Sequence, residues 1–105
     1  YLDGINNPNI HLPEWKIDEQ HVFHLFVIRH HNRDALQQTL FDNGIQALIH
    51  YPIPPHKQRA YQSCFPSSFP LTEAVHREIL SLPLSPVMKA KDVDKVIGVL
   101  NEIER

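Results

Sequence analysis

The chain is predicted to form an α+β fold, a small and mostly antiparallel sheet with helices packed on one face. Two observations predict this class. Residues 22–28 are almost entirely β-branched or aromatic, which is typical of a strand, and residues 92–103 carry the clearest amphipathic helical stripe in the chain. The predicted order is strand, helix, strand, loop, helix, short strand, helix, which suits a small sheet covered by helices.

The first 20 residues differ from the rest of the chain in their composition. They are polar and are broken by Pro8 and Pro13, so residues 1–20 are expected to be an extended lead-in with at most a little helix at the start. Residues 21–105 are expected to form the folded domain. The strand predicted at residues 22–28 is apolar except for His24, which indicates a central strand covered on both faces.

A helix is predicted to follow this strand. Asn32 or Arg33 can begin it, and Gly44 is well placed as the left-handed residue that closes it. Residues 45–49 are then predicted to form a second strand. The apolar face of the helix is expected to consist of Ala35, Leu36, Leu40 and Phe41.

The second half of the chain begins with a proline-rich stretch. Prolines lack an N–H group and restrict the preceding residue, so residues 50–68 are predicted to be a long ordered loop with one helical turn near residues 57–61. A helix is predicted at 71–81, a short edge strand at 82–84 and a last helix at 92–103. The middle helix is expected to bury Leu71, Val75, Ile79 and Leu82.

The composition sets limits on the class of protein. With 105 residues, the chain has room for one domain, and its 42% of hydrophobic residues is too high for a disordered chain. Its 10 basic and 12 acidic residues do not suggest a nucleic-acid partner. The single cysteine, Cys64, fits a reducing compartment, and no apolar run is long enough to cross a membrane. A soluble, cytoplasmic protein is predicted, and the missing initial methionine suggests part of a longer chain.

Eight histidines raise the question of a metal site. His21 and His24 are three residues apart in a predicted strand, so they are expected to point to opposite faces. His30 and His31 are adjacent, which is a poor geometry for joint chelation. No cysteine pair and no His-Glu-x-x-His helix completes a zinc site, so no metal is predicted.

Nucleophilic catalysis has one weak candidate. Cys64 lies in the proline-rich loop and could pair with His56, although a lone cysteine is more often a small buried apolar residue. The chain has only three glycines and contains no glycine-rich phosphate loop.

Residues 44–56 are the strongest candidate for a functional segment. A strand end would deliver His50 and Tyr51 to one edge of the sheet, and the following prolines would hold them there. Together these side chains offer a donor, an acceptor and an aromatic face, which suits a sugar, a base or a phosphate. From the residues alone, ligand binding by His50 and Tyr51 is no more favoured than packing of these side chains beneath the loop.

Several short motifs occur in order over residues 20–104. They comprise residues 22–28, Asn32-Arg33-Asp34, Gly44-Ile45, His50-Tyr51-Pro52-Ile53-Pro54 with His56, Phe69-Pro70, Glu73-Ala74 and the run from Glu78 to Pro86. Together they resemble the C-terminal part of the DegT/DnrJ/EryC1/StrS aminotransferases.

The resemblance implies the small domain of a fold-type-I enzyme that uses pyridoxal 5'-phosphate. Such enzymes transfer an amino group, usually from glutamate, to a nucleotide-linked keto-sugar, and typically act as homodimers. The resemblance further implies that His50, Tyr51 and His56 bind substrate. The catalytic lysine and the cofactor contacts are expected in a large N-terminal domain, so residues 1–105 alone are expected neither to bind the cofactor nor to transaminate.

Two other hypotheses remain open from the sequence. One is a free-standing α+β module whose sheet and loop bind a small ligand or a peptide. The other is a regulatory relative that keeps the scaffold without the catalytic lysine. The sugar, its nucleotide and the carbon that is aminated are not set by these residues.

Overall fold

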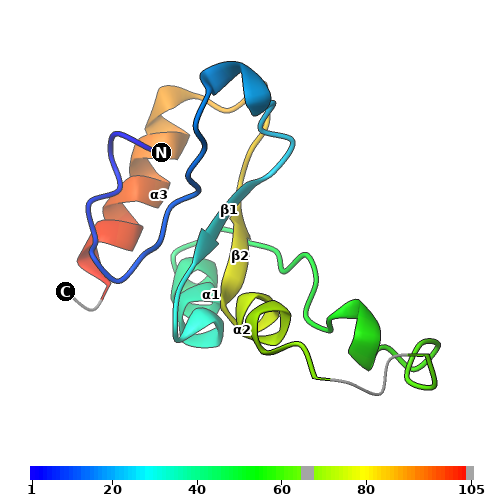
Figure 1. Ribbon diagram of the computed structural model, residues 1–105. Coiled ribbons are helices and arrows are strands. Elements are labelled where there is room, and N and C mark those ends of the chain that lie inside the picture. The colour runs from blue at the N-terminus through cyan, green and yellow to red at the C-terminus, as the bar shows by residue number, and fades with distance from the viewer. Residues whose placement is uncertain (65–67, 104–105) are drawn as a thin grey trace.

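The computed structural model describes residues 1–64 and 68–103. Its strands are β1 (Phe26–Arg29) and β2 (Ile79–Leu82), and its helices are α1 (Arg33–Asp42), α2 (Pro70–Glu78) and α3 (Ala90–Glu102). Two 3₁₀ turns occupy Asp18–Gln20 and Pro55–Lys57. Figure 1 shows the two strands at the centre, with the N-terminal segment running alongside α3. The antiparallel pair and its helices confirm the predicted α+β class.

The sheet is small and its second strand is enclosed. β1 and β2 are antiparallel, with Ile28 opposite Leu80. All four residues of β2 are buried, as expected for a strand covered on both faces. Isolated bridges extend the outer edges of the pair, His11 with Arg29 beside β1 and Leu48 with Ser81 beside β2.

The first strand is shorter than predicted, because residues 22–25 lie outside β1. Val22 is 89% exposed, and Phe23 has a φ of 48°, a backbone conformation that side chains other than glycine rarely adopt. The ring of Phe23 packs edge-on against Trp15 and stacks on Phe26. This aromatic packing places the turn before β1, and the apolar pattern of the sequence does not show it.

The strand predicted at residues 45–49 forms only one bridge, at Leu48. The neighbouring carbonyl of Ala47 accepts a hydrogen bond from the side-chain amide of Gln37, at 2.8 Å. A helix side chain therefore takes up a backbone group that a further strand would otherwise pair with.

The boundary between α2 and β2 also differs from the prediction. The helix ends at Glu78, and Ile79 is already extended, with a φ of −71° and a ψ of 140°. Residues 79–81, which were predicted to continue the helix, belong to β2 instead. This strand begins three residues before the strand predicted at 82–84. At the other end of the predicted stripe, Leu71 is 76% exposed. The helical turn predicted near residues 57–61 lies at Pro55–Lys57.

Helices α1 and α3 form close to their predicted positions. In α1, Leu36 and Leu40 are buried as predicted, whereas Ala35 is exposed and Phe41 is 69% exposed. The closing residue Gly44 has a φ of 71°, which confirms its predicted left-handed conformation. Over residues 1–64 and 68–103, no helix combines the length and the apolar character needed to cross a membrane.

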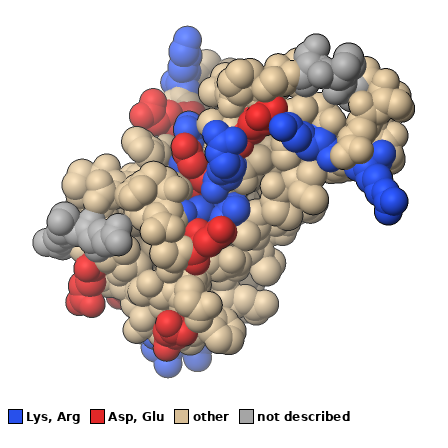
Figure 2. All heavy atoms as spheres, turned by 90° about the horizontal axis from the view of Figure 1, so that it is seen from below, with Lys and Arg blue, Asp and Glu red and all other residues tan. Residues whose placement is uncertain are grey.

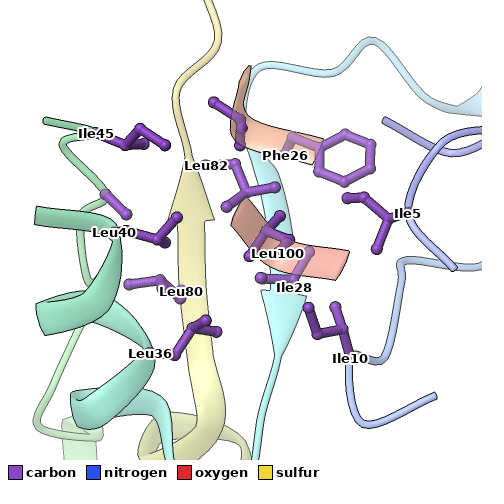
Figure 3. Close-up of a cluster of buried hydrophobic side chains, with 12 residues drawn as sticks. Ile5, Ile10, Phe26, Ile28, Leu36, Leu40, Ile45, Leu80, Leu82 and Leu100 are labelled. Atoms are coloured by element: carbon purple, nitrogen blue, oxygen red, sulfur yellow. The ribbon is translucent and has the colours of Figure 1, made fainter. Parts of the chain in front are cut away.

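Side chains from both ends of the chain meet in one core. Figure 3 shows Ile5 and Ile10 of the N-terminal segment beside Ile28 and Leu100, with the residues of α1 across the sheet. Polar contacts close the same junction, since the side-chain amide of Asn7 donates to the carbonyl of Leu100 at 2.9 Å. Residues 5–10 thus contribute directly to the core, and α3 is covered by the start of the chain.

Candidate functional site

Segment 44–50 runs along the free edge of β2 and delivers His50 to the end of the sheet. The backbone N–H and carbonyl of Leu48 both bond to Ser81, at 3.0 and 2.7 Å. The Nδ1 atom of His50 lies 2.9 Å from the Oγ of the same serine. The half-buried imidazole is therefore held in one orientation by a buried hydroxyl.

Tyr51 is the exposed member of the pair. The residue is 66% exposed, and its ring stands edge-on to the His50 ring, with centroids 5.5 Å apart. Its carbonyl accepts a hydrogen bond from Nδ1 of His76 at 2.6 Å, so that nitrogen carries a proton. The backbone is fastened while the phenol is free to contact a ligand, because its hydroxyl makes no hydrogen bond within the described part of the chain.

His56 is placed differently from His50 and Tyr51, because it is buried. Its Nε2 lies 2.9 Å from Oε1 of Glu73, and its ring stands edge-on to Phe69. The structure thus brings His50 and Tyr51 together and places His56 against the start of α2.

Glu73 accepts several hydrogen bonds at one carboxylate oxygen. Besides His56, the Oγ of Ser68 and the N–H of Phe69 donate to it at 3.0 and 3.1 Å, and the ammonium of Lys57 lies 3.6 Å away. The hydrogen bond from His56, followed by that from the Phe69 backbone, lowers the pKa of Glu73 to about 2. At neutral pH this side chain is therefore a carboxylate that binds donors from both ends of the loop.

The roles of Glu73 and His76 escape prediction from the sequence. Their partners His56 and Tyr51 lie 17 and 25 residues away across a proline-rich loop. No helical or strand period links such positions. The only sequence signal is that Glu73 and His76 are three residues apart in a predicted helix, and therefore share a face.

The surface beside His50 is hollowed. A groove of about 580 Å³ runs between segment 44–50 and the chain that follows β2, and its lining includes Leu48, His50, Leu84, Met88 and Lys95. Its lining is largely apolar and also includes the charged residues Asp92 and Lys95, a character suited to an amphipathic ligand or a covering protein segment.

Charges on the surface are mixed. Figure 2 shows basic and acidic side chains interspersed on the face seen from below. This face therefore has no single-sign field of the kind that binds a polyanion. Within residues 1–64 and 68–103, no group of three His, Cys, Asp or Glu side chains is arranged to hold a metal ion.

The sequence also suggested a Cys64–His56 pair, and the structure does not bring these residues together as a catalytic unit. His56 uses Nε2 for Glu73. Cys64 is exposed, whereas a buried apolar role was expected for it. The Sγ atom of Cys64 lies 4.0 Å from the Oγ of Ser63.

Comparison with known proteins identifies the family. The model of the DegT/DnrJ/EryC1/StrS aminotransferase family matches residues 2–101. The chain is 52% identical over 101 residues to dTDP-3-amino-3,6-dideoxy-alpha-D-galactopyranose transaminase of Aneurinibacillus thermoaerophilus, covering 96% of this chain and 28% of that protein. The chain thus spans about a quarter of the length of this relative.

Solved structures agree with the sequence match. Streptomyces venezuelae DesV, solved in complex with a ketimine intermediate, superposes with a TM-score of 0.86 at 38% identity, covering 90% of this chain and 26% of DesV. A Bacillus subtilis protein, ntda, solved with bound cofactor PMP, gives a TM-score of 0.76 at 32% identity, covering 89% and 22% of the two chains.

These comparisons do not support the alternatives of a free-standing binding module or a regulatory relative. They confirm the resemblance first indicated by the His50-Tyr51-Pro52 and Leu82-Pro83 segments. The chain belongs to the DegT/DnrJ/EryC1/StrS aminotransferase family.

Proposed function

We propose that this chain is the C-terminal, substrate-binding part of an aminotransferase that uses pyridoxal 5'-phosphate. The intact enzyme transfers an amino group from an amino acid, glutamate, to a nucleotide-linked keto-sugar. The observation that carries the proposal is the exposed phenol of Tyr51 beside an oriented His50, within a chain that matches the family over residues 2–101.

The proposed roles of His50, Tyr51 and His56 follow from their surroundings. Tyr51 offers an aromatic face and a hydroxyl to the sugar or base, and His50 offers its remaining ring nitrogen, Nε2. His56 belongs to the same site, where its bond to Glu73 fixes the loop that carries the other two. All three contribute binding, and none is assigned an acid–base step.

The residues of this chain do not fit the attachment of the cofactor. A lysine that holds pyridoxal 5'-phosphate needs an enclosed site, in which its amine can be desolvated. All five lysines here are exposed, and Lys57 is paired with Glu73. The proposal therefore places cofactor binding in a large N-terminal domain of the full-length protein, and no catalytic step is assigned to this chain.

The remaining partners belong to the same proposal. Residues 1–20 lead in from the large domain and pack through Ile5 and Ile10 against the small domain formed by residues 21–105. The intact enzyme is a cytoplasmic homodimer. The name of the Aneurinibacillus relative specifies an amino group at carbon 3 of a dTDP-linked 6-deoxy sugar, which makes a dTDP-linked 3-keto-6-deoxyhexose the first substrate to test.

The test uses the full-length gene product. We expect it to show cofactor absorbance in the near-ultraviolet to visible range, to change that spectrum with glutamate, and to aminate the dTDP-linked 3-keto-sugar. Residues 1–105 expressed alone should show no such absorbance. The proposal fails if this fragment binds the cofactor stoichiometrically, or if the full-length protein reacts with glutamate yet aminates no nucleotide-linked keto-sugar.

A further inference from the structure

Helix α2 holds the proline-rich segment 51–56 at both of its ends. At one end, Nδ1 of His76 donates to the carbonyl of Tyr51 at 2.6 Å. At the other end, Nε2 of His56 donates to Glu73 at 2.9 Å. Glu73 and His76 are three residues apart, so they lie on one face of the helix. One helical turn therefore fastens both the start and the end of the segment.

The contact at Glu73 also ties together the two ends of the outer loop. His56 and Lys57 approach the carboxylate from the 3₁₀ turn, and Ser68 and Phe69 approach it from just before α2. The side chains of His56 and Glu73 are only 7% and 16% exposed. Water competes weakly with charge-assisted hydrogen bonds between side chains that are so little exposed. The contacts of Glu73 with His56, Lys57, Ser68 and Phe69, here called the clasp, are therefore expected to persist in solution.

The segment between the two anchors is stiff. Three of its four residues, 52–55, are prolines, and the fourth, Ile53, is restricted because it precedes a proline. Few backbone torsions between His56 and Tyr51 can therefore change freely. A displacement of His56 is expected to move Tyr51 as well. Figure 1 shows this part of the chain leaving the sheet and passing over α2 before it extends outward.

We propose that Glu73 and His76 are positioning residues that set where the ring of Tyr51 meets the substrate. They act through the backbone and His56 and touch no reacting atom themselves. This inference rests on the proposed function, because it assumes that Tyr51 faces the nucleotide-linked sugar.

The first test is structural and does not depend on activity. Hydrogen exchange is measured on the full-length gene product for peptides covering residues 55–60, where the N–H groups of Lys57 and Gln58 bond to Pro54 and Pro55. Glu73→Gln is expected to speed exchange there about tenfold, since it removes the charged acceptor. Glu78→Gln is the matched control on the same helix. Glu78 forms an ion pair with Arg29, with 2.6 Å between the two side chains, and takes no part in the contacts of the loop. Unchanged exchange in Glu73→Gln overturns the proposal.

The second test separates positioning from general damage. In Glu73→Gln, we expect the KM for the keto-sugar nucleotide to rise about tenfold, with the glutamate half-reaction within about twofold of wild type. His56→Leu removes the side-chain donor to Glu73 and should therefore resemble Glu73→Gln. Faster exchange without a change in KM, or an equal loss in both half-reactions, overturns the positioning role.

The two proposals can fail separately. If the wild-type enzyme aminates no nucleotide-linked sugar, the proposed function fails and the positioning role fails with it, even when exchange shows that the clasp exists. If the wild type is active and Glu73→Gln matches it in both exchange and KM, only the positioning role fails.

Discussion

The Nδ1 of His50 lies 2.9 Å from the Oγ of Ser81, and the backbone of the same serine pairs with Leu48. One buried residue of β2 thus holds two positions of the neighbouring segment. A hydroxyl can donate one hydrogen bond and accept others, so this serine suits either tautomer of the histidine. The orientation of His50 depends on β2 more than on its own segment.

Replacement of Ser81 by alanine tests this dependence. We expect Ser81→Ala to lower the free energy of unfolding by about 1 kcal/mol, because the half-buried ring nitrogen loses its partner. The KM for the keto-sugar nucleotide should rise as well, since the ring is free to turn. Urea unfolding and steady-state kinetics measure the two effects. Ser85→Ala at an exposed position is the control, and a Ser81→Ala enzyme indistinguishable from it would contradict the assignment.

Tyr51 should affect substrate binding and leave the cofactor in place. We expect Tyr51→Ala to weaken binding of the keto-sugar nucleotide about tenfold or more, through loss of an exposed aromatic face. Tyr51→Phe keeps the ring and reports the share of the hydroxyl. Titration calorimetry measures affinity, and cofactor absorbance is the control readout. Loss of that absorbance in Tyr51→Ala would count against a substrate role.

The clasp at Glu73 should weaken in acid. Its pKa, about 2 in the folded chain, lies below the ordinary glutamate value of 4.5, mainly because of the hydrogen bond from His56. The ionised group therefore contributes its full stabilisation above about pH 4.5, and this contribution is lost as the pH falls toward 2. The titratable partners facing it within the described chain are His56 and Lys57.

The measurement is a comparison of wild type with Glu73→Gln. We expect the difference in their unfolding free energies to be full at pH 5, smaller at pH 3 and least near pH 2, as followed by urea unfolding at each pH. Glu78→Gln is again the matched control. A difference that grows as the pH falls would refute the assigned ionisation.

Leu100 tests the core. It is fully buried beside Leu80 and Ile28, so Leu100→Ala should lower the free energy of unfolding by about 2–5 kcal/mol, through lost apolar burial and the cavity left behind. Leu71→Ala removes the same atoms at an exposed position and should change it by less than about 0.5 kcal/mol. Chemical denaturation measures both, and similar effects would show that the core is placed wrongly.

Local signals predicted the helices well and the strands poorly. α1 and α3 were identified by their apolar spacing and by Gly44, which act within a few residues of chain. The start of β1 depends on the packing of Phe23 against Trp15, and segment 45–49 depends on Gln37 of another element. Strand boundaries here are decided by contacts between elements, which a single sequence does not display.

The residues of the candidate site were also predicted only in part. His50, Tyr51 and His56 were singled out by their motif, and their role stays a prediction. Glu73 and His76 were missed as members of the site because their partners lie across a loop whose path no period describes. Proline content predicted that the loop would be ordered, but it could not show which helix the loop would contact.

The junction between the N-terminal segment and α3 has a consequence for synthesis. Asn7 donates to the carbonyl of Leu100, and Ile5 shares a core with that leucine, so these partners are separated by more than 90 residues. During translation, the early segment must wait for α3 to leave the ribosome before its apolar side chains find their cover. Until then, Ile5 and Ile10 are open to chaperones or to aggregation, and α3 completes the core that contains them.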